Sequence, residues 1–490
     1  MCGFLISVQA ESVNRRMTPS GVDITSRGPD FLSVKNIQVS NLNINIEFAH
    51  LFITEPKGYQ PLESEEYLLV LNGEIYNYKE LTQNLDVDGG NDTQVFFSYL
   101  ESYGIEETLK KVNGMFSGIL IYKDTGKCIA FTDHVGKKPT LVWNSDYGLH
   151  IGTGLDRNYI DDSSAFLKVL KPGVHEIDLS NGNIQYISSS PSISVCNKTL
   201  STLLLDSVRT RIPEGLPFAV ALSGGLDSSI LTYIIEKQLG LSPDYFVIGE
   251  KLPNSVISLM AHLDISHERV RVINPSRYND LRSLLVDTCS VVKSYNPSIV
   301  SNGMATMVLA KAVHEAGYRV LIGGEGADEF FCGYQAMYNG QYCPNEMRES
   351  LIRDLHFTEL RRVDLICSHY AIEARCPFLD RGVTSFAMSK PASSHCSSES
   401  KTGKMLLRNE YKGLLPDIII DADKEPFDIS SGVQRKVVEY LKEHDSSERE
   451  VLKRIYKEKF GKLDIYDLPY FNQYPVFDRM IDTRGNKYSS

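Results

Sequence analysis

The first residues that could do chemistry stand at the start of the chain, which reads MCGFLISV. Removal of the initiator methionine, which is usual before a small residue, would leave Cys2 with a thiol and a free α-amine on one carbon. The amine can take the thiol proton, so such a residue is nucleophile and base in one unit. Cys2 could also simply be a small residue that opens a buried strand, so these residues alone leave the choice open.

A second candidate site is the stretch SGGLDSS, which follows the apolar run FAVAL and precedes a helical pattern. Glycines at a strand–loop–helix junction let the backbone approach a phosphate, and the helix N-terminus supplies positive potential. We therefore expect nucleotide binding by Ser223, Gly224, Gly225, Asp227, Ser228 and Ser229. Asp227 would repel phosphate directly, so we expect it to hold Mg²⁺. The alternative is a Gly-Ser turn capped by an aspartate.

The stretch GGEGADE, from Gly323 to Glu329, is a second candidate loop because it follows the apolar run RVLI. Ligands of open α/β sheets bind at the carboxyl ends of the strands, where both loops would meet. Gly324 would then lie at the nucleotide, Asp328 would be the second Mg²⁺ ligand, and Glu325 would contact the activated substrate. Taken alone, the same residues would read as a solvated acidic turn.

The elements that must position these residues change character along the chain. Short strand patterns dominate the first 190 residues, as in NLNINIEFAHLFI with its period of two. A Ser-rich stretch from Ile187 to Leu200 is the expected linker. Strands then alternate with helices, which predicts a doubly wound parallel sheet. We expect an α+β domain over residues 2–190 and an α/β domain over residues 200–490, with helices beyond Arg353.

Composition narrows the classes of protein further. The 490 residues carry a net charge of -11, which argues against a general nucleic-acid binder. The nine cysteines form no CxxC pairs, so a disulfide framework and a zinc site are not expected. No apolar run reaches the length of a membrane span, and the start lacks a signal-peptide pattern. We expect a reduced, cytoplasmic protein without nucleic-acid or membrane partners.

Taken together and in this order, MCG, NGEIYNY, SGGLDSS, GGEGADE and IEARCPFLD resemble the glutamine-dependent asparagine synthetases over nearly the whole chain. The resemblance implies an N-terminal nucleophile glutaminase domain with an αββα sandwich, followed by an ATP pyrophosphatase domain. It implies that glutamine is hydrolysed at the first site. Ammonia would then pass through an internal tunnel to a small carboxylic acid activated as its adenylate. ATP and Mg²⁺ are the implied cofactors, and the family's frequent dimers make a homodimer conceivable.

The resemblance also implies roles for residues of the first domain. Cys2 would form the glutamyl thioester, Asn72 and Gly73 would stabilise the oxyanion, and Asp92 and Glu74 would bind the substrate, Asp92 holding its α-ammonium group. Two arginines that the family usually has are absent. The stretch AHLFITEP, from Ala49 to Pro56, lacks the one that clamps the glutamine carboxylate, and Thr132 stands where the other precedes Asp133.

In the second domain the resemblance implies that Lys404 of KMLLR stabilises pyrophosphate departure. Glu373 of IEAR would either contact substrate or form an ion pair with Arg375. Ser301 stands about where the family has an arginine that holds aspartate, so another acceptor acid becomes credible beside aspartate. A ring-closing relative, a non-catalytic binding paralogue and another pyrophosphatase-loop enzyme are the remaining alternatives. Each explains fewer of the motifs.

Overall fold

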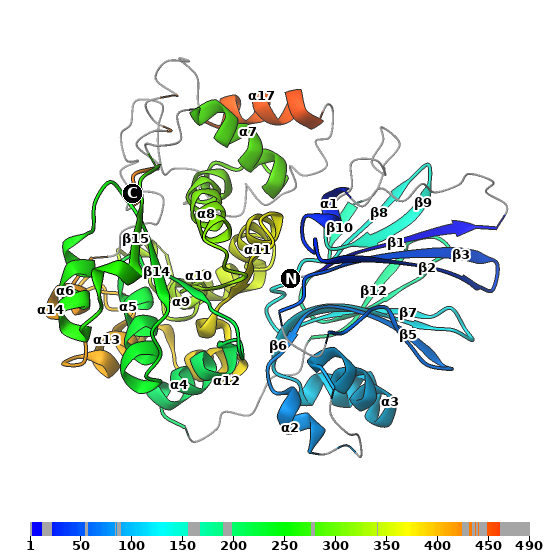
Figure 1. Cartoon of the computed structure of the whole chain (residues 1–490), viewed down its shortest axis with the longest axis horizontal. Coiled ribbons are helices and arrows are strands. Elements are labelled where there is room, and N and C mark those ends of the chain that lie inside the picture. Colours follow the sequence, from blue (N-terminus) through cyan, green and yellow to red (C-terminus); the bar gives the residue numbers. More distant parts are fainter. Residues whose placement is uncertain are drawn as a thin grey trace.

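The computed structural model of the chain describes residues 2–11, 22–53, 57–83, 85, 90–154, 167–189, 198–275, 280–340, 342–423, 431–433, 437, 440 and 448–460. Figure 1 shows a strand-rich half beside a half with a central sheet surrounded by helices. The amino end of the chain lies between the two halves, where they face each other. Within the described residues, no helix is long and apolar enough to cross a membrane.

Two antiparallel sheets form the strand-rich half. One has the strand order β10-β8-β9-β1-β3-β2 and the other β12-β11-β7-β6-β5-β4. The strands of the first sheet are β1 (Gly3–Ala10), β2 (Phe31–Val39), β3 (Leu42–His50), β8 (Leu141–Ser145), β9 (Gly148–Gly152) and β10 (Leu167–Val169). Those of the second are β4 (Leu62–Glu63), β5 (Tyr67–Ile75), β6 (Gly114–Tyr122), β7 (Cys128–Thr132), β11 (Val174–Ile177) and β12 (Ile184–Ser188).

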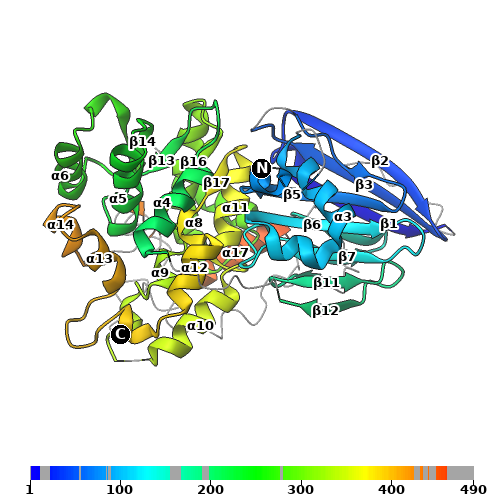
Figure 2. The ribbon, with the colours of Figure 1, turned by 90° about the horizontal axis from the view of Figure 1, so that it is seen from below.

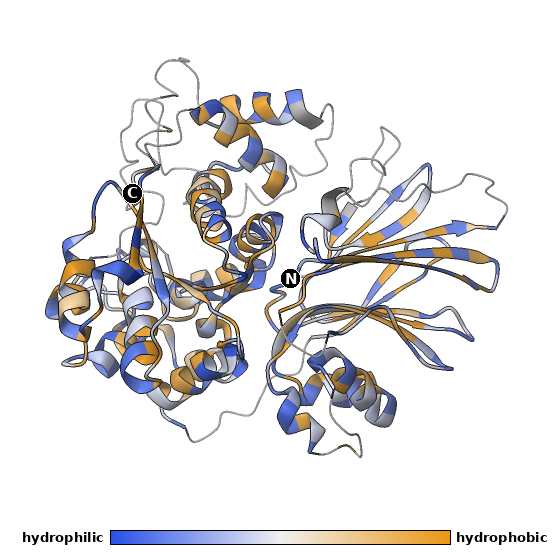
Figure 3. Cartoon of the chain, viewed as in Figure 1, coloured by the Kyte–Doolittle hydropathy of each residue, from blue (hydrophilic) through white to orange (hydrophobic). Residues whose placement is uncertain are grey.

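The two sheets pack face to face because alternate side chains of their strands are apolar. Ile46 and Phe48 of β3 and Val70 of β5 belong to the buried cluster between them, and apolar stretches run along both sheets in Figure 3. The other face of the second sheet buries a separate cluster with α3 (Asp92–Lys111), next to α2 (Tyr78–Thr82). On the outer face of the first sheet, the described residues place the short helix α1 (Val22–Thr25).

The second half is built around a parallel sheet with the order β15-β14-β13-β16-β17. Its strands are β13 (Ala219–Ala221), β14 (Asp244–Ile248), β15 (Val270–Ile273), β16 (Val320–Ile322) and β17 (Glu373–Arg375). Helices lie around this sheet (Figure 2). They include α4 (Leu200–Arg211), α5 (Leu226–Tyr233), α6 (Asn254–Leu263), α7 (Leu281–Val292), α8 (Pro297–Glu315), α9 (Ala327–Phe330), α10 (Pro344–Asp354), α11 (Glu359–His369), α12 (Arg381–Met388), α13 (Met405–Tyr411), α14 (Asp417–Ile420) and α17 (Glu448–Phe460).

The predicted fold class is confirmed: antiparallel sheets come first and a parallel sheet with helices follows. One local expectation was incomplete. The IEAR stretch lies in the region expected to be helical, yet it forms β17, because Glu373–Arg375 pairs with β16 at the edge of the sheet. Helix α8 begins at Pro297, capped by Asn296, so Ser301 lies inside a helix. The domain boundaries at 190 and 200 stay a prediction, and residues 190–197 of the expected linker lie outside the described residues.

Candidate active sites

Cys2 lies directly before β1, next to Arg27, which also bonds Asp364 of the other half. Its Sγ is 4.0 Å from the carbonyl oxygen of Leu51, and its own carbonyl accepts a hydrogen bond from Arg27 Nε at 3.1 Å. Burial raises the pKa of the Cys2 thiol, and the charges of Glu373 and Asp92 act in the same direction. The thiol therefore needs a nearby base to become a thiolate at neutral pH.

The expected oxyanion pair lies in β5, in register with β6. Asn72 is completely buried, and neither atom of its amide has a hydrogen-bond partner among the described residues. Burying an amide without a partner is costly, which is typical of a group held ready for a ligand. Gly73 has a φ of +150°, and a Cβ there would lie 2.0 Å from the carbonyl oxygen of Met115. Only glycine fits this position.

Two carboxylates lie beside this pair. Asp92, in the first turn of α3, accepts a hydrogen bond from the backbone N–H of Ile75 at 2.9 Å. Burial raises the pKa of Asp92 to about 6 and that of Glu74 to about 8. Buried carboxylates of this kind gain from a bound cation, so an ammonium group of a substrate would suit their surroundings.

Arg375 joins this group from the other half of the molecule. Its Nε donates to Glu373 at 2.7 Å, and its Nη2 lies 3.5 Å from Glu74. Burial alone would raise the pKa of Glu373, but the Arg375 guanidinium outweighs it and lowers that pKa to about 2. Of the two roles considered for Glu373, the structure shows the ion pair. The contact between Arg375 and Glu74 was not foreseen, because 300 residues separate them in the sequence.

The SGGLDSS stretch forms the predicted loop after β13 and the first turn of α5. Gly224 has a φ of +78°, and a Cβ there would lie 2.3 Å from Ser255 Oγ. The hydroxyl of Ser223 contacts that of Ser228 at 3.1 Å and accepts from the N–H of Gly225 at 3.3 Å. Ser229 is buried and donates to the carbonyl of Gly225 at 2.8 Å, so its hydroxyl is engaged within the loop.

Lys404 brings the two acidic loops together. Its Nζ lies 2.6 Å from Asp227 Oδ2 and 2.7 Å from Asp328 Oδ1, and the side chain is buried. The loops approach so closely that a Cβ on Gly324 would lie 3.1 Å from the Cβ of Asp227, and one on Gly333 would meet both Asp328 and Lys404. The structure thus assembles three predicted residues that the sequence separates by up to 177 positions.

The same carboxylates fit a divalent cation. Asp227 Oδ1 is buried and has no hydrogen-bond partner among the described residues, and hard carboxylate oxygens are what Mg²⁺ prefers. No group of three or more His, Cys, Asp or Glu that could hold a metal occurs in the described parts of the chain. Two carboxylates from the protein, with the remaining ligands from phosphates and water, is the usual Mg²⁺ arrangement at a nucleotide.

Glu325 is a third acidic residue of the second loop, beside Asp328 and Glu329. Cys376 directly follows Arg375 in the sequence, and its thiol lies 3.9 Å from Glu325 Oε2. Burial raises the pKa of Glu325, although the Arg362 guanidinium opposes the shift.

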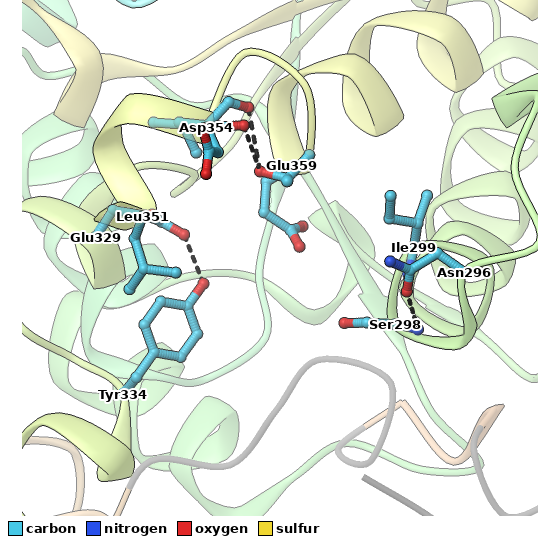
Figure 4. A pocket seen from close by; sticks show the side chains of 10 residues that line it. Asn296, Ser298, Ile299, Glu329, Tyr334, Leu351, Asp354 and Glu359 are labelled. Carbon is cyan, nitrogen blue, oxygen red and sulfur yellow. Dashed lines mark hydrogen bonds between the residues drawn. The ribbon is translucent and has the colours of Figure 1, made fainter. Parts of the chain in front are cut away.

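A small cavity adjoins the second loop (Figure 4). The acidic residues Glu329, Asp354 and Glu359 are among those that line it. The phenol of Tyr334 donates to Glu329, and burial raises the pKa of Glu329 to about 7. Residues Asn296, Ser298, Ile299, Leu351, Leu355 and Thr358 complete the lining.

The arginine expected near Ser301 is absent from α8, but α11 brings another one to the same region. Arg362 is buried, donates to Glu359 through Nε at 2.9 Å, and hydrogen-bonds Thr306 of α8. Sequence reasoning missed Arg362, Glu329 and Tyr334. Glu329 closes the GGEGADE motif and Tyr334 follows five residues later, so the motif was the available signal.

Two family models match the chain. The family model described as "Asparagine synthase" matches residues 199–355 and 343–464, and the one described as "Glutamine amidotransferase domain" matches residues 1–160. A relative from Acanthamoeba polyphaga mimivirus, named as a probable glutamine-hydrolysing asparagine synthetase, is 24% identical over 96% of this chain and 93% of its own. One from Oryza sativa subsp. japonica, named glutamine-hydrolysing asparagine synthetase 2, is 27% identical over 91% of this chain and 79% of its own.

Among solved structures, the one titled as the allosteric regulatory enzyme of purine biosynthesis is similar over 52% of this chain and 67% of its own. At 13% identity and a TM-score of 0.30, this likeness is too weak to support a conclusion about fold or function. The match to the asparagine synthase model, by contrast, spans more than half of the chain and contains both acidic loops and Lys404. By its sequence and by the motifs that the fold brings together, the chain belongs to the asparagine synthase family.

Proposed function

We propose that the protein is an ATP-dependent amide ligase that takes its ammonia from glutamine, with aspartate as the default acceptor. The observation that carries the proposal is the position of Lys404 between Asp227 and Asp328, which are contributed by two separate loops. A buried ammonium between two carboxylates at the carboxyl ends of parallel strands suits a nucleotide whose phosphates change charge during the reaction.

At the first site, the thiol of Cys2 attacks the amide carbon of glutamine. The α-amine exposed by removal of Met1 takes the thiol proton and passes it to the departing ammonia. The amide of Asn72 and the backbone N–H of Gly73 donate to the oxyanion. Water then cleaves the thioester to give glutamate. Asp92 and Glu74, both buried carboxylates, hold the α-ammonium of the substrate.

At the second site, the loops at Ser223–Ser229 and Gly323–Glu329 cradle ATP. The acceptor carboxylate attacks the α-phosphorus and pyrophosphate leaves, while Lys404 stabilises the developing negative charge. Ammonia then attacks the acyl carbon and AMP leaves. When bound, Mg²⁺ held by Asp227 and Asp328 would neutralise phosphate charge. Glu325 accepts the proton that the attacking ammonia loses.

The cavity beside Glu329 supports an amino acid as the acceptor. Its acidic lining suits an α-ammonium group, and Arg362 beside Glu359 places one positive charge in the same region. An amide ligase that acts on a different carboxylic acid is the second candidate, because Ser301 stands in α8 where the family's arginine is expected.

The proposal is tested by measuring pyrophosphate release from ATP and Mg²⁺, with ammonium chloride or with glutamine, across carboxylic acids headed by aspartate. We expect release with aspartate and recovery of asparagine. Release with another acid alone would keep the ligase chemistry and change the acceptor. Release with none of the acids would contradict the proposal.

The matched variant is Cys2→Ala, which removes the thiol at the first site and leaves the second site intact. We expect it to abolish glutamine-driven turnover and to keep ammonia-driven turnover, because free ammonia bypasses the thioester. If Cys2→Ala still used glutamine, the assignment of the nucleophile would be wrong.

A further inference from the structure

The glutaminase site lacks an expected cation, and a short segment nearby supplies one. The stretch from Ala49 to Pro56 contains no arginine that could bind the α-carboxylate of glutamine. The next residue is Lys57, whose side chain is exposed and whose Nζ lies 5.3 Å from the centre of the Phe52 ring. Phe52 directly follows Leu51, the residue whose carbonyl faces the thiol of Cys2.

The segment that carries Lys57, residues 57–60, is anchored next to the other site residues as well. The amide of Gln60 donates to the carbonyl of Leu71 at 2.8 Å and accepts from its N–H, directly before Asn72 in β5. Gly58 packs so tightly on the amide of Asn91 that a Cβ would lie 2.2 Å from its Nδ2. Asn91 directly precedes Asp92.

Residues 57–60 therefore contact the sequence neighbours of three site residues. Leu71 precedes Asn72 and Asn91 precedes Asp92. Phe52 follows Leu51, whose carbonyl faces the thiol of Cys2. Gln60 is buried, and backbone hydrogen bonds link both Gly58 and Gln60 to the ring of His50. Anchors on three sides fix the backbone from which the side chain of Lys57 extends. A positioned backbone lowers the entropy cost of placing a lysine ammonium at a ligand.

Other cations near the thiol are already engaged. Arg27 donates to Asp364 at 2.7 Å and to Ser368 at 2.8 Å. Arg319 binds both carboxylate oxygens of Asp30. Lys57 forms no ion pair with a carboxylate of the described residues, and its contact with Phe52 leaves the hydrogen-bonding capacity of its ammonium unused.

From this placement we propose that Lys57 binds the α-carboxylate of glutamine and so replaces the missing arginine clamp. The inference rests on the proposed glutaminase function and names the residue that recognises the acid group of its substrate. A lysine is a point charge without the planar fork of arginine, so it holds a carboxylate with less geometric selectivity.

The test compares glutamine with glutaminamide, in which an uncharged carboxamide replaces the α-carboxylate. For Lys57→Ala we expect kcat/KM for glutamine, measured by the release of ammonia, to fall about tenfold, mainly because KM rises. The value for glutaminamide should not change, because that molecule offers no charge to bind. Lys57→Arg should restore most of the loss. The matched control is Lys127→Ala, an exposed lysine of the same half that pairs with Glu176.

An equal fall for both substrates would show a structural role, and no fall for glutamine would show that Lys57 does not touch it. Either result would overturn the proposal. Binding of glutamine to Cys2→Ala, measured by calorimetry with and without Lys57→Ala, separates this inference from the glutaminase chemistry. Weaker binding in the double variant is expected even if the parent chain hydrolyses no glutamine, whereas unchanged binding contradicts the role of Lys57.

Discussion

Gly73 combines two constraints at one residue of the strand β5. Its φ of +150° is unfavourable for any side chain, and the carbonyl of Met115 occupies the space that a Cβ would need. Its neighbour Asn72 keeps a buried amide without a partner among the described residues. Such an arrangement lowers the stability of the free protein, and the binding of an oxyanion would offset this loss.

We expect Gly73→Ala to lower the free energy of unfolding by about 2 kcal/mol or more, because backbone strain and a clash with Met115 add. It should also abolish glutamine hydrolysis, since β5 must shift away from the oxyanion. Urea denaturation and ammonia release measure the two effects. The control is Gly104→Ala in α3, where φ is +75° but nothing lies within 4 Å of a Cβ. If both variants lost the same stability and kept hydrolysis, the close fit of Gly73 would be unimportant.

At the scale of elements, the turn before α13 positions Lys404. The residue has a φ of +56°, and its backbone N–H donates to the carbonyl of Phe331 at 3.2 Å. The turn is thus tied to the segment that follows the second acidic loop. Helix α13 starts directly after Lys404, which is its N-cap residue.

Replacement of Lys404 by methionine keeps the length of the side chain and removes its charge. We expect pyrophosphate release to fall at least about a hundredfold with either glutamine or ammonia, because a charge at the leaving group is lost. Glutamine hydrolysis at the first site should continue. Lys401→Met, an exposed lysine in the same turn with a φ of +50°, is the control. Retention of activity in Lys404→Met would remove this lysine from the mechanism.

The elements that could be predicted from the sequence are those with local signals. SGGLDSS lies between an apolar strand and a helix, and these residues settle the loop without distant contacts. The strand β17 carries no such signal, since its three residues are held by pairing with β16. For the same reason Arg375 beside Glu74 and Arg362 beside Thr306 could not be foreseen, because these partners come from other elements.

At the scale of the whole molecule, buried ion pairs connect the two halves. Asp364 of α11 accepts from Arg27 at 2.7 Å and from Lys138 at 3.1 Å, and all three side chains are buried. Burial alone would raise the pKa of Asp364, but the two cations outweigh it and lower the pKa below its usual value. Arg381 likewise reaches across to the carbonyls of Leu109 and Val112.

Asp364→Asn would leave two buried cations without their anion, so we expect a loss of about 3–5 kcal/mol in the free energy of unfolding. A lowered pKa in the folded state means that this contribution is present above the unfolded value, near pH 4, and is lost as the pH falls through the folded value. The parent chain should therefore lose stability in acid more steeply than Asp364→Asn, as measured by thermal unfolding against pH. Parallel acid profiles would contradict the assignment.

The segment from Ile372 to Asp380 touches both halves within nine residues. Arg375 reaches Glu74, Cys376 contacts Glu325, and Asp380 accepts from Arg211 and from Asn113. The two halves are consequently poor candidates for exchange as modules. A chimaera that joins this glutaminase half to the synthetase half of a relative would separate Glu74 and Asn113 from their partners. A working hybrid would have to carry the segment, or its contact residues, together with the glutaminase half.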